Sequence, residues 1–286
     1  MSGSEYTHLE VSSVMEQMLF ATVRLEALDS SNNTRIGTSF FVNVLLESLN
    51  YPFLVTNKHV VDGAEKGKLT FTKKEGDKPV IGTGVQLVIN DFSKGWYGHP
   101  DVEIDVAIAP AKPVLAYVKS QLGVDAYVRM VGSDLFPSDD ALKALDALEE
   151  VVFIGYPSGI WDRTNLLPVI RKGTTASPIA LDYEGKKQFL IDASVFPGSS
   201  GSPVFLYNAG MYSMKTGATV IGSRLLFLGI VSAVLYREDL NEIKSISSAT
   251  PVAISKQMID LGLVFKTSAI METVRGFLKD KGSKSK

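Results

Sequence analysis

The stretch Asp192-Ala-Ser-Val-Phe-Pro-Gly-Ser-Ser-Gly-Ser-Pro-Val204 decides how the rest of the chain is interpreted. Apolar residues lead into it at Phe189-Leu-Ile191 and out of it at Val204-Phe205, as expected for two strands. The residues between are turn formers, which exclude a regular strand or helix. Such a turn presents a serine hydroxyl beside free backbone N–H groups, the arrangement that acyl transfer requires. Taken alone, the motif indicates no more than a serine–glycine loop between two strands.

Two other segments supply a histidine and an acid. Phe53-Leu-Val-Thr-Asn-Lys-His59-Val-Val61 is an apolar strand that ends in a histidine, and Ile104-Asp105-Val-Ala-Ile108 places one acid inside an apolar strand. A buried aspartate is costly unless it is paired or hydrogen-bonded, whereas a lone strand-end histidine is more often structural. Together with the turn, these segments give the chain order His59, Asp105, Ser200.

These three segments resemble trypsin/chymotrypsin-fold serine proteases, closest to the HtrA/Deg-like bacterial branch. Their order is that of chymotrypsin, and differs from the orders of subtilisin and of the α/β-hydrolases. Gly37-Thr-Ser-Phe-Phe-Val42 fits the strand before the histidine, and Gly229-Ile-Val-Ser232 fits the strand that lines the substrate cleft. Ser202 stands where the family usually has a second glycine. Ser199 replaces an aspartate that pairs with a freed N-terminus in animal trypsins, so no zymogen activation is expected.

The resemblance implies an all-β fold of two six-stranded antiparallel β-barrels, with short helices and a C-terminal helix. Residues 1–110 are expected to form a leader and the first barrel, 111–147 the crossover, and 148–286 the second barrel with the terminal helix, all in one protease domain without a PDZ-like module. Helical patterns occur at 114–122, 138–148 and 268–278, and the last two strands are expected at 225–235 and 250–254. The basic tail from 279 is expected to be disordered.

The resemblance also implies how the catalytic residues act. Ser200 would be the nucleophile, His59 the general base, and Asp105 the residue that orients the imidazole. The backbone N–H groups of Gly198 and Ser200 would form the oxyanion hole. His99, in a loop with Gly98 and Pro100, is interpreted as a surface histidine rather than as the base.

The family pattern places four residues in the substrate pocket. Ser194 would lie at its floor, and Ser232, Ala233 and Val234 along its wall. Because no acid stands at 194, a preference for Lys or Arg lacks its charge partner. We expect cleavage after small or medium apolar residues.

Composition bounds the partners and the compartment. The 286 residues are 45% hydrophobic and 21% charged with a net charge of −2, which gives no general attraction to nucleic acid or to an anionic membrane. There are no cysteines, and phosphate-binding, dinucleotide and zinc-protease motifs are absent, so we expect no cofactor and no metal. The first 19 residues hold no Lys or Arg, and the apolar run 225–236 is too short to span a bilayer, so a cytoplasmic location is expected.

Two functions from different classes remain open on the sequence alone. The first is a serine endopeptidase that cleaves protein or peptide substrates through a covalent acyl-enzyme. An unregulated protease would endanger a cytoplasm, so such an enzyme is expected to be gated by a regulatory protein partner or an effector. The alternative is a catalytically silent trypsin-fold module that binds a protein partner through the same cleft.

Overall fold

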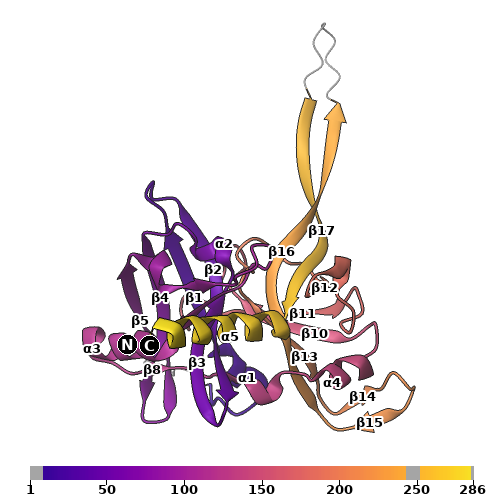
Figure 1. Ribbon diagram of the computed structural model, residues 1–286, viewed down its shortest axis with the longest axis horizontal. Helices are drawn as coiled ribbons and strands as arrows, with labels where there is room; N and C mark the ends of the chain where they lie inside the picture. Colours follow the sequence, from indigo (N-terminus) through magenta and orange to yellow (C-terminus); the bar gives the residue numbers. More distant parts are fainter. Residues whose placement is uncertain (1–8, 243–251, 285–286) are drawn as a thin grey trace, which may run out of the picture.

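The computed structural model describes residues 9–242 and 252–284, which form two β-rich halves side by side (Figure 1). The first half is built on a nine-stranded sheet with the main order β5-β4-β1-β2-β3-β7-β6, to which β8 and β9 add short pairings with β4 and β2. Its elements are α1 Val14–Leu19, β1 Thr22–Leu28, β2 Thr34–Leu46, β3 Leu49–Thr56, α2 Lys58–Val61, β4 Lys66–Glu75, β5 Lys78–Asn90, η1 Phe92–Gly95, β6 Tyr97–Gly98, β7 Ala107–Pro110, α3 Ala111–Leu122, β8 Ala126–Tyr127 and β9 Val131–Gly132.

The long strand β2 organises this first half. It pairs with β1 on one side and with β3 on the other, and successive side chains point to opposite faces of the sheet. Phe40 therefore packs into one apolar cluster and Phe41 into a second, and both side chains are fully buried. Cores on both faces fix the register, because a slip by one residue would exchange the two sets.

The second half contains a closed barrel with the strand order β10-β11-β12-β17-β16-β13. A core centred on Phe153, Phe189 and Ile191 fills it. The elements from the crossover onward are η2 Ser133–Leu135, α4 Asp139–Ala144, β10 Glu150–Gly155, η3 Pro157–Gly159, β11 Val169–Thr175, η4 Tyr183–Gly185, β12 Gln188–Asp192, β13 Pro203–Asn208, β14 Met211–Ser213, β15 Thr219–Ile221, β16 Arg224–Glu242, β17 Val252–Lys266 and α5 Thr267–Lys284.

The expected trypsin-like, mostly β fold is confirmed, with one difference between the halves. The second half closes into a six-stranded barrel as expected. The first half is instead a nine-stranded sheet, in which the short strands β8 and β9 lie off the main order of seven. Both crossover helices are present as α3 and α4, and Ser138 caps α4 by accepting a hydrogen bond from the Ala141 amide at 3.2 Å. The helix therefore begins where the serine and the acids of its first turn predict.

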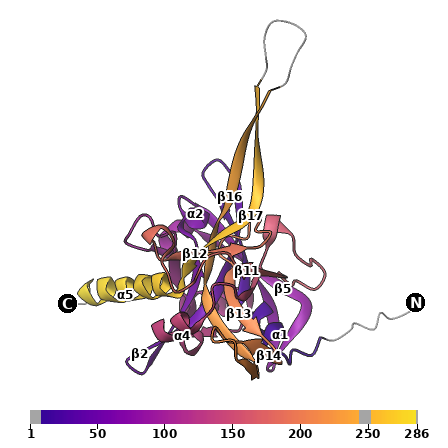
Figure 2. The same ribbon diagram turned by 90° about the vertical axis from the view of Figure 1, so that its right-hand side faces the viewer.

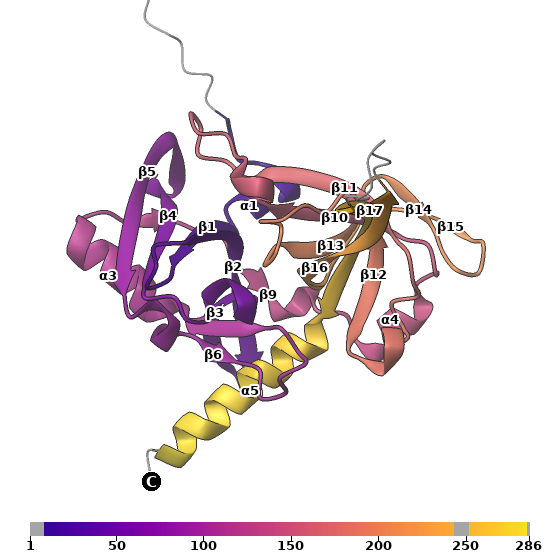
Figure 3. The same cartoon turned by 90° about the horizontal axis from the view of Figure 1, so that it is seen from above.

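The C-terminal helix α5 extends back from the barrel across the first half (Figure 3). Phe277 packs edge-on against Phe53 and Tyr97, with ring centroids 5.5 and 5.6 Å apart, and the Tyr97 hydroxyl donates to Asp280 at 2.8 Å. The helix was expected over 268–278 but continues to Lys284, so the expected disorder of the tail is wrong for residues 279–284. The Tyr97–Asp280 bond anchors this extension to the first half.

Strands β16 and β17 are far longer than the sequence patterns predicted. Beyond the barrel they project as a two-stranded ribbon away from both halves (Figures 1 and 2). Its register runs from Tyr236 opposite Met258 to Glu242 opposite Val252. Part of the strand expected over 250–254 lies outside the described residues. Strand β16 carries both Ser232 and the ribbon that begins at Tyr236, so the ribbon is continuous with the strand that borders the candidate site.

Candidate active site

His59 lies on the short helix α2, immediately after strand β3. Asn57 ends the extended segment, and buried Val60 and Val61 anchor the helix in the core of the first half. The imidazole stays accessible, with 50% of its side-chain surface exposed. The residue was expected at a strand end, and the helix of one turn carries it just past that end. This arrangement leaves the ring accessible while its backbone is fixed.

Asp105 lies just before β7 rather than inside a strand, and it contacts His59 twice. Its Oδ2 is 2.6 Å from His59 Nδ1, and its Oδ1 accepts from the His59 amide at 3.0 Å. Ser232 Oγ donates to Oδ2 at 2.7 Å, and Asn57 Nδ2 donates to the Asp105 carbonyl at 2.7 Å. The carboxylate is thus held by three donors, and its backbone by a fourth.

These contacts determine the charge of Asp105. Burial alone raises the pKa of the carboxyl group, but the hydrogen bond and the charge of His59 act against it, together with the Ser232 hydroxyl and the His59 amide. The sum holds the pKa of Asp105 below its ordinary value. The group is therefore an anion at neutral pH, facing one nitrogen of the imidazole.

Ser200 lies on a tight turn between β12 and β13. Gly201 has φ 87°, and a Cβ there would lie 1.8 Å from the Thr38 carbonyl oxygen, so only glycine fits. Gly198 has φ 86°, and a Cβ there would lie 2.8 Å from the Ser158 amide nitrogen. The two glycines let the turn pack against both halves of the molecule.

The hydroxyl of Ser200 donates to the Ser232 carbonyl at 3.1 Å. In the part of the chain that the structure describes, no hydrogen bond joins this hydroxyl to His59. Ser232 links the two sets of contacts, because its hydroxyl bonds Asp105 while its carbonyl accepts from Ser200. All three candidate residues are thus connected through Ser232, although no direct bond joins Ser200 to His59 in the described residues.

Thr38 on β2 is a site residue that the sequence patterns did not single out. It is fully buried, and its amide donates to the Ser200 carbonyl at 2.9 Å. Its Oγ1 accepts from the Tyr156 amide at 3.2 Å and from Ser202 Oγ at 3.3 Å. A strand of the first half therefore fixes the nucleophile turn of the second. Nothing in the sequence distinguishes this threonine from other strand threonines.

The amides expected to form an oxyanion hole belong to the same turn. Within residues 9–242 and 252–284, neither the Gly198 nor the Ser200 amide donates to a protein acceptor. The turn is braced from outside, because the Ser158 amide of η3 donates to the Pro197 carbonyl at 2.5 Å. Both amides are thus left without internal partners, as donors for a substrate carbonyl must be.

The four expected substrate-pocket residues are divided between two segments. Ser194 lies exposed in the loop after β12, and Ser232 is 6% exposed on β16. Ala233 pairs with Leu263 and Val234 with Gly262, so both continue β16 beyond the site, but their side chains lie outside the described ones. The hydroxyl of Ser232 donates to Asp105, a contact that its expected place on the wall of the substrate pocket did not predict. The substrate-pocket roles stay predictions.

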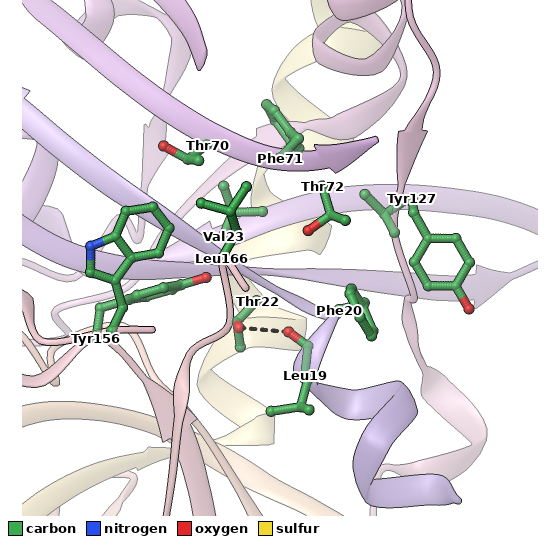
Figure 4. A pocket seen from close by; sticks show the side chains of 12 residues that line it. Leu19, Phe20, Thr22, Val23, Thr70, Phe71, Thr72, Tyr127, Tyr156 and Leu166 are labelled. Atoms are coloured by element: carbon green, nitrogen blue, oxygen red, sulfur yellow. Dashed lines mark hydrogen bonds between the residues drawn. The ribbon is translucent and has the colours of Figure 1, made fainter. Parts of the chain in front are cut away.

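Two cavities differ in size and in distance from these residues. A cavity of about 440 Å³ is bordered by Asp105 and Ser232 and lies between the two halves. A second of about 10 Å³ lies between β1, β4 and the loop at Tyr156, with Tyr127 at its far side (Figure 4). The second is scarcely large enough for one water molecule. Only the larger cavity is of a size to take part of a ligand.

His99 is not a surface histidine, so that expectation is wrong. It is 8% exposed, its Nδ1 accepts from the Asp101 amide at 3.0 Å, and its Nε2 lies 3.5 Å from Glu272 of α5. The helix that covers it comes from the opposite end of the chain, which explains why a local pattern did not reveal the burial. Its contact with Asp101 braces the loop that leads to Asp105.

The described residues offer neither a metal site nor a helix that could span a membrane. No group of three or more His, Asp or Glu side chains there could hold a metal ion. No helix in residues 9–242 or 252–284 is both long enough and apolar enough to cross a bilayer.

Comparison with solved structures finds weak but extensive similarity. An inactive serine-to-alanine mutant of Rv3671c from M. tuberculosis H37Rv matches 93% of this chain and 91% of its own, at 16% identity and a TM-score of 0.44. The serine endoprotease from Yersinia pestis matches 95% and 69%, at 15% identity and 0.47. The HtrA-type protease AlgW with a tripeptide matches 92% and 62%, at 15% identity and 0.49.

Sequence comparison is more decisive. Comparison with curated protein sequences finds no significant match. The family model for the trypsin-like peptidase domain matches residues 37–211, which span His59, Asp105 and Ser200. Because this match covers more than half of the chain, the protein belongs to the trypsin-like peptidase family.

Proposed function

We propose that this protein is a serine endopeptidase that uses His59, Asp105 and Ser200 as its catalytic triad. The observation that carries the proposal is the short bond of 2.6 Å between His59 Nδ1 and Asp105 Oδ2. It leaves Nε2 as the free nitrogen of the ring, on a side chain that is half exposed. Ser200 is bonded to the same Ser232 that holds Asp105, so the nucleophile belongs to the same group of contacts.

The proposed reaction follows from the roles of these atoms. Ser200 Oγ attacks the carbonyl carbon of a peptide bond while His59 Nε2 takes its proton. The negative charge that forms on the carbonyl oxygen is stabilised by the Gly198 and Ser200 amides. His59 returns the proton to the leaving nitrogen, which frees the amine and leaves an acyl-enzyme. His59 then takes a proton from water as the water attacks the ester carbon, and returns it to Ser200 Oγ as the C–O bond breaks and the carboxylic acid leaves. Asp105 stabilises the imidazolium in both steps.

The proposal includes gating by a partner or an effector. Ser200 Oγ donates to the Ser232 carbonyl, so the hydroxyl must turn to His59 before the first proton transfer. Ser232 is also the unpaired residue at the first of two irregularities in the register of β16, which lie between Val231 and Ala233 and between Val234 and Tyr236. A ligand that shifts β16 at these bulges would move the carbonyl and release the hydroxyl.

The experiment that tests the function is labelling with a fluorophosphonate probe, which reacts with activated serines. The purified protein is compared with Ser200→Ala, and with Ser199→Ala as a matched control, because Ser199 is a buried neighbour with no hydrogen-bond partner for its hydroxyl. We expect labelling of the wild type and of Ser199→Ala, and none of Ser200→Ala.

Other outcomes favour the alternatives. If the wild type is not labelled, either alone or with peptide present, the endopeptidase proposal is wrong and the silent binding module takes its place. Rapid labelling and peptide cleavage without any additive would instead contradict the gating while leaving the triad intact.

A further inference from the structure

The cavity of about 440 Å³ beside the proposed triad is bordered by both apolar and acidic side chains. Leu263 and Phe265 of β17 provide the apolar part. Three carboxylates border the cavity together with a single ammonium group; these residues are Glu103, Asp105, Glu184 and Lys186. The three carboxylates would repel an anionic group. A long aliphatic side chain with a positive end matches both its surfaces.

The positive charge already present is neutralised by one of the acids. Lys186 Nζ lies 2.8 Å from Glu103 Oε2, and this pair raises the pKa of Lys186. Lys266, at the end of β17, lies 2.6 Å from Asp182 and bonds the Leu181 carbonyl, so it too has its counter-charge. The charge of Glu184 contributes less than Glu103 to the raised pKa of Lys186, and in the described residues its carboxylate makes no hydrogen bond or ion pair.

The side-chain amide oxygen of Gln188 is a second acceptor at the cavity. Gln188 borders the cavity and is only 4% exposed, and its Nε2 donates weakly to the Tyr183 carbonyl at 3.4 Å. Among the described residues, no donor reaches its amide oxygen. The oxygen is not one of the fully buried polar atoms, so it is open to the cavity, where it can accept a hydrogen bond from an ammonium or guanidinium group.

The cavity is within reach of a substrate chain bound at Ser200. Ser232 borders the cavity, and its carbonyl lies 3.1 Å from Ser200 Oγ. An extended peptide advances about 3.3 Å per residue, so residues two to four positions before the cleaved bond pass this region.

We propose that this cavity is a specificity site for a lysine or arginine side chain two to four residues before the cleaved bond. The inference rests on the proposed endopeptidase function, and it names the class of substrate as peptides with a basic residue upstream of an apolar one. The aliphatic stem would pack on Leu263 and Phe265, and the charged end would bind Glu184 and the Gln188 oxygen.

The test measures binding to full-length Ser200→Ala, so that it does not depend on catalysis. Fluorescent ten-residue peptides carry lysine, norleucine or glutamate at each of the three positions, and their affinities are compared by anisotropy. We expect lysine at one position to bind about fivefold more tightly than norleucine, and glutamate to bind more weakly. The advantage of lysine should shrink as salt is added.

Three second-site variants in this background sharpen the test. Glu184→Gln should remove most of the preference for lysine, and Lys186→Gln should increase it by freeing Glu103. Asp77→Asn, a fully exposed acid outside the cavity, should leave it unchanged. Equal binding of the lysine and norleucine peptides, a preference insensitive to Glu184→Gln, or no binding of any peptide would overturn the inference.

The outcomes also separate the inference from the proposed function. A wild type that reacts with fluorophosphonate but shows no lysine preference retains the triad and loses only the specificity site. A wild type that does not react, with a lysine preference that depends on Glu184, retains the site on a silent binding module.

Discussion

The two halves of the molecule hold the proposed catalytic residues in different ways. In the first half, His59 and Asp105 are already joined by two hydrogen bonds, and Asn57 fixes the backbone of the acid. In the second, the barrel fixes the backbone of Ser200, while its hydroxyl bonds the Ser232 carbonyl. The base and its acid are thus assembled within one half, whereas the nucleophile depends on contacts that cross between the halves.

Two residues make those crossing contacts. Thr38 belongs to the first half and holds the turn that carries Ser200 and Ser202. Ser232 belongs to the second half and donates to Asp105 of the first. Substitutions within one half and at the contacts between them should therefore differ in what they impair, and the following predictions test that difference.

The largest effect is expected from Asp105→Asn, which breaks the pair inside the first half. An asparagine at this position would present its NH₂ group or a neutral oxygen to His59 Nδ1, so the tautomer with a free Nε2 lone pair loses its support. We expect kcat/KM for peptide cleavage to fall by about 10⁴, with the fold retained. Steady-state kinetics and circular dichroism check both parts. A loss of less than tenfold would contradict the role of Asp105.

The second prediction concerns the turn at the contact between the halves. In Gly201→Ala, the new Cβ would lie 1.8 Å from the Thr38 carbonyl oxygen and 2.8 Å from Thr56 Oγ1. Because the backbone of Thr38 cannot move aside without distorting strand β2, we expect a loss of more than about 3 kcal/mol in the free energy of unfolding, or no folding.

Gly185→Ala is the matched control for this prediction. Gly185 has φ 71°, as unfavourable for alanine as φ 87° at Gly201, but no atom lies within 4 Å of its Cβ position. This variant should lose only about 1 kcal/mol, the cost of the backbone conformation. Urea unfolding of both variants measures the difference, and equal losses would mean that the contact with Thr38 does not matter.

The local features of the site were accessible from the sequence because local chemistry determines them. A run of proline, glycine and serine around Ser200 can only form a turn, and apolar segments beside His59 and Asp105 predict strands that end near one another. The closed second barrel was expected from the family resemblance, and so were the roles of the candidate residues. The same resemblance predicted a first six-stranded barrel where the structure has a nine-stranded sheet.

The features that were missed depend on partners far away in the chain. His99 is buried because α5 returns across the first half, and Thr38 is a site residue because the Ser200 turn packs on it. The length of β16 and β17 was also missed, since charged residues such as Glu238 and Asp239 interrupt the apolar pattern that was used to end the strand. Periodicity along one segment carries no information on such contacts.

The third prediction removes the Thr38 hydroxyl and keeps the shape of the side chain. Thr38→Val leaves the buried Tyr156 amide and Ser202 Oγ without their acceptor, and should cost about 1–3 kcal/mol in the free energy of unfolding. Because the bond with Ser202 and the donation of the Thr38 hydroxyl to the Gly198 carbonyl at 3.5 Å both hold the turn around Ser200, fluorophosphonate labelling should also slow.

Ser39→Ala is the control at the next position. Ser39 is equally buried, but its hydroxyl donates to the Val55 carbonyl, within the first half. This variant should lose stability without slower labelling. Slower labelling in both variants would mean that the nucleophile responds to the stability of the first half in general, and not to the contact between the halves.

The smallest effect is expected at Tyr156, which lies fully buried where the second half meets the first. Burial raises its pKa to about 12, against opposing effects of Thr22 and Arg24. In the unfolded chain the tyrosine phenol ionises near pH 10, so the folded state binds the proton more tightly. The associated stability is complete below pH 10 and lost as the pH rises toward 12.

Compared with Tyr156→Phe, the wild type should lose about 1 kcal/mol in the free energy of unfolding between pH 9 and pH 11. Urea unfolding of both proteins at the two pH values measures this difference and cancels the titration of the lysines. A difference that does not change with pH would mean that water reaches the phenol, and that the halves are less tightly packed here than at Thr38.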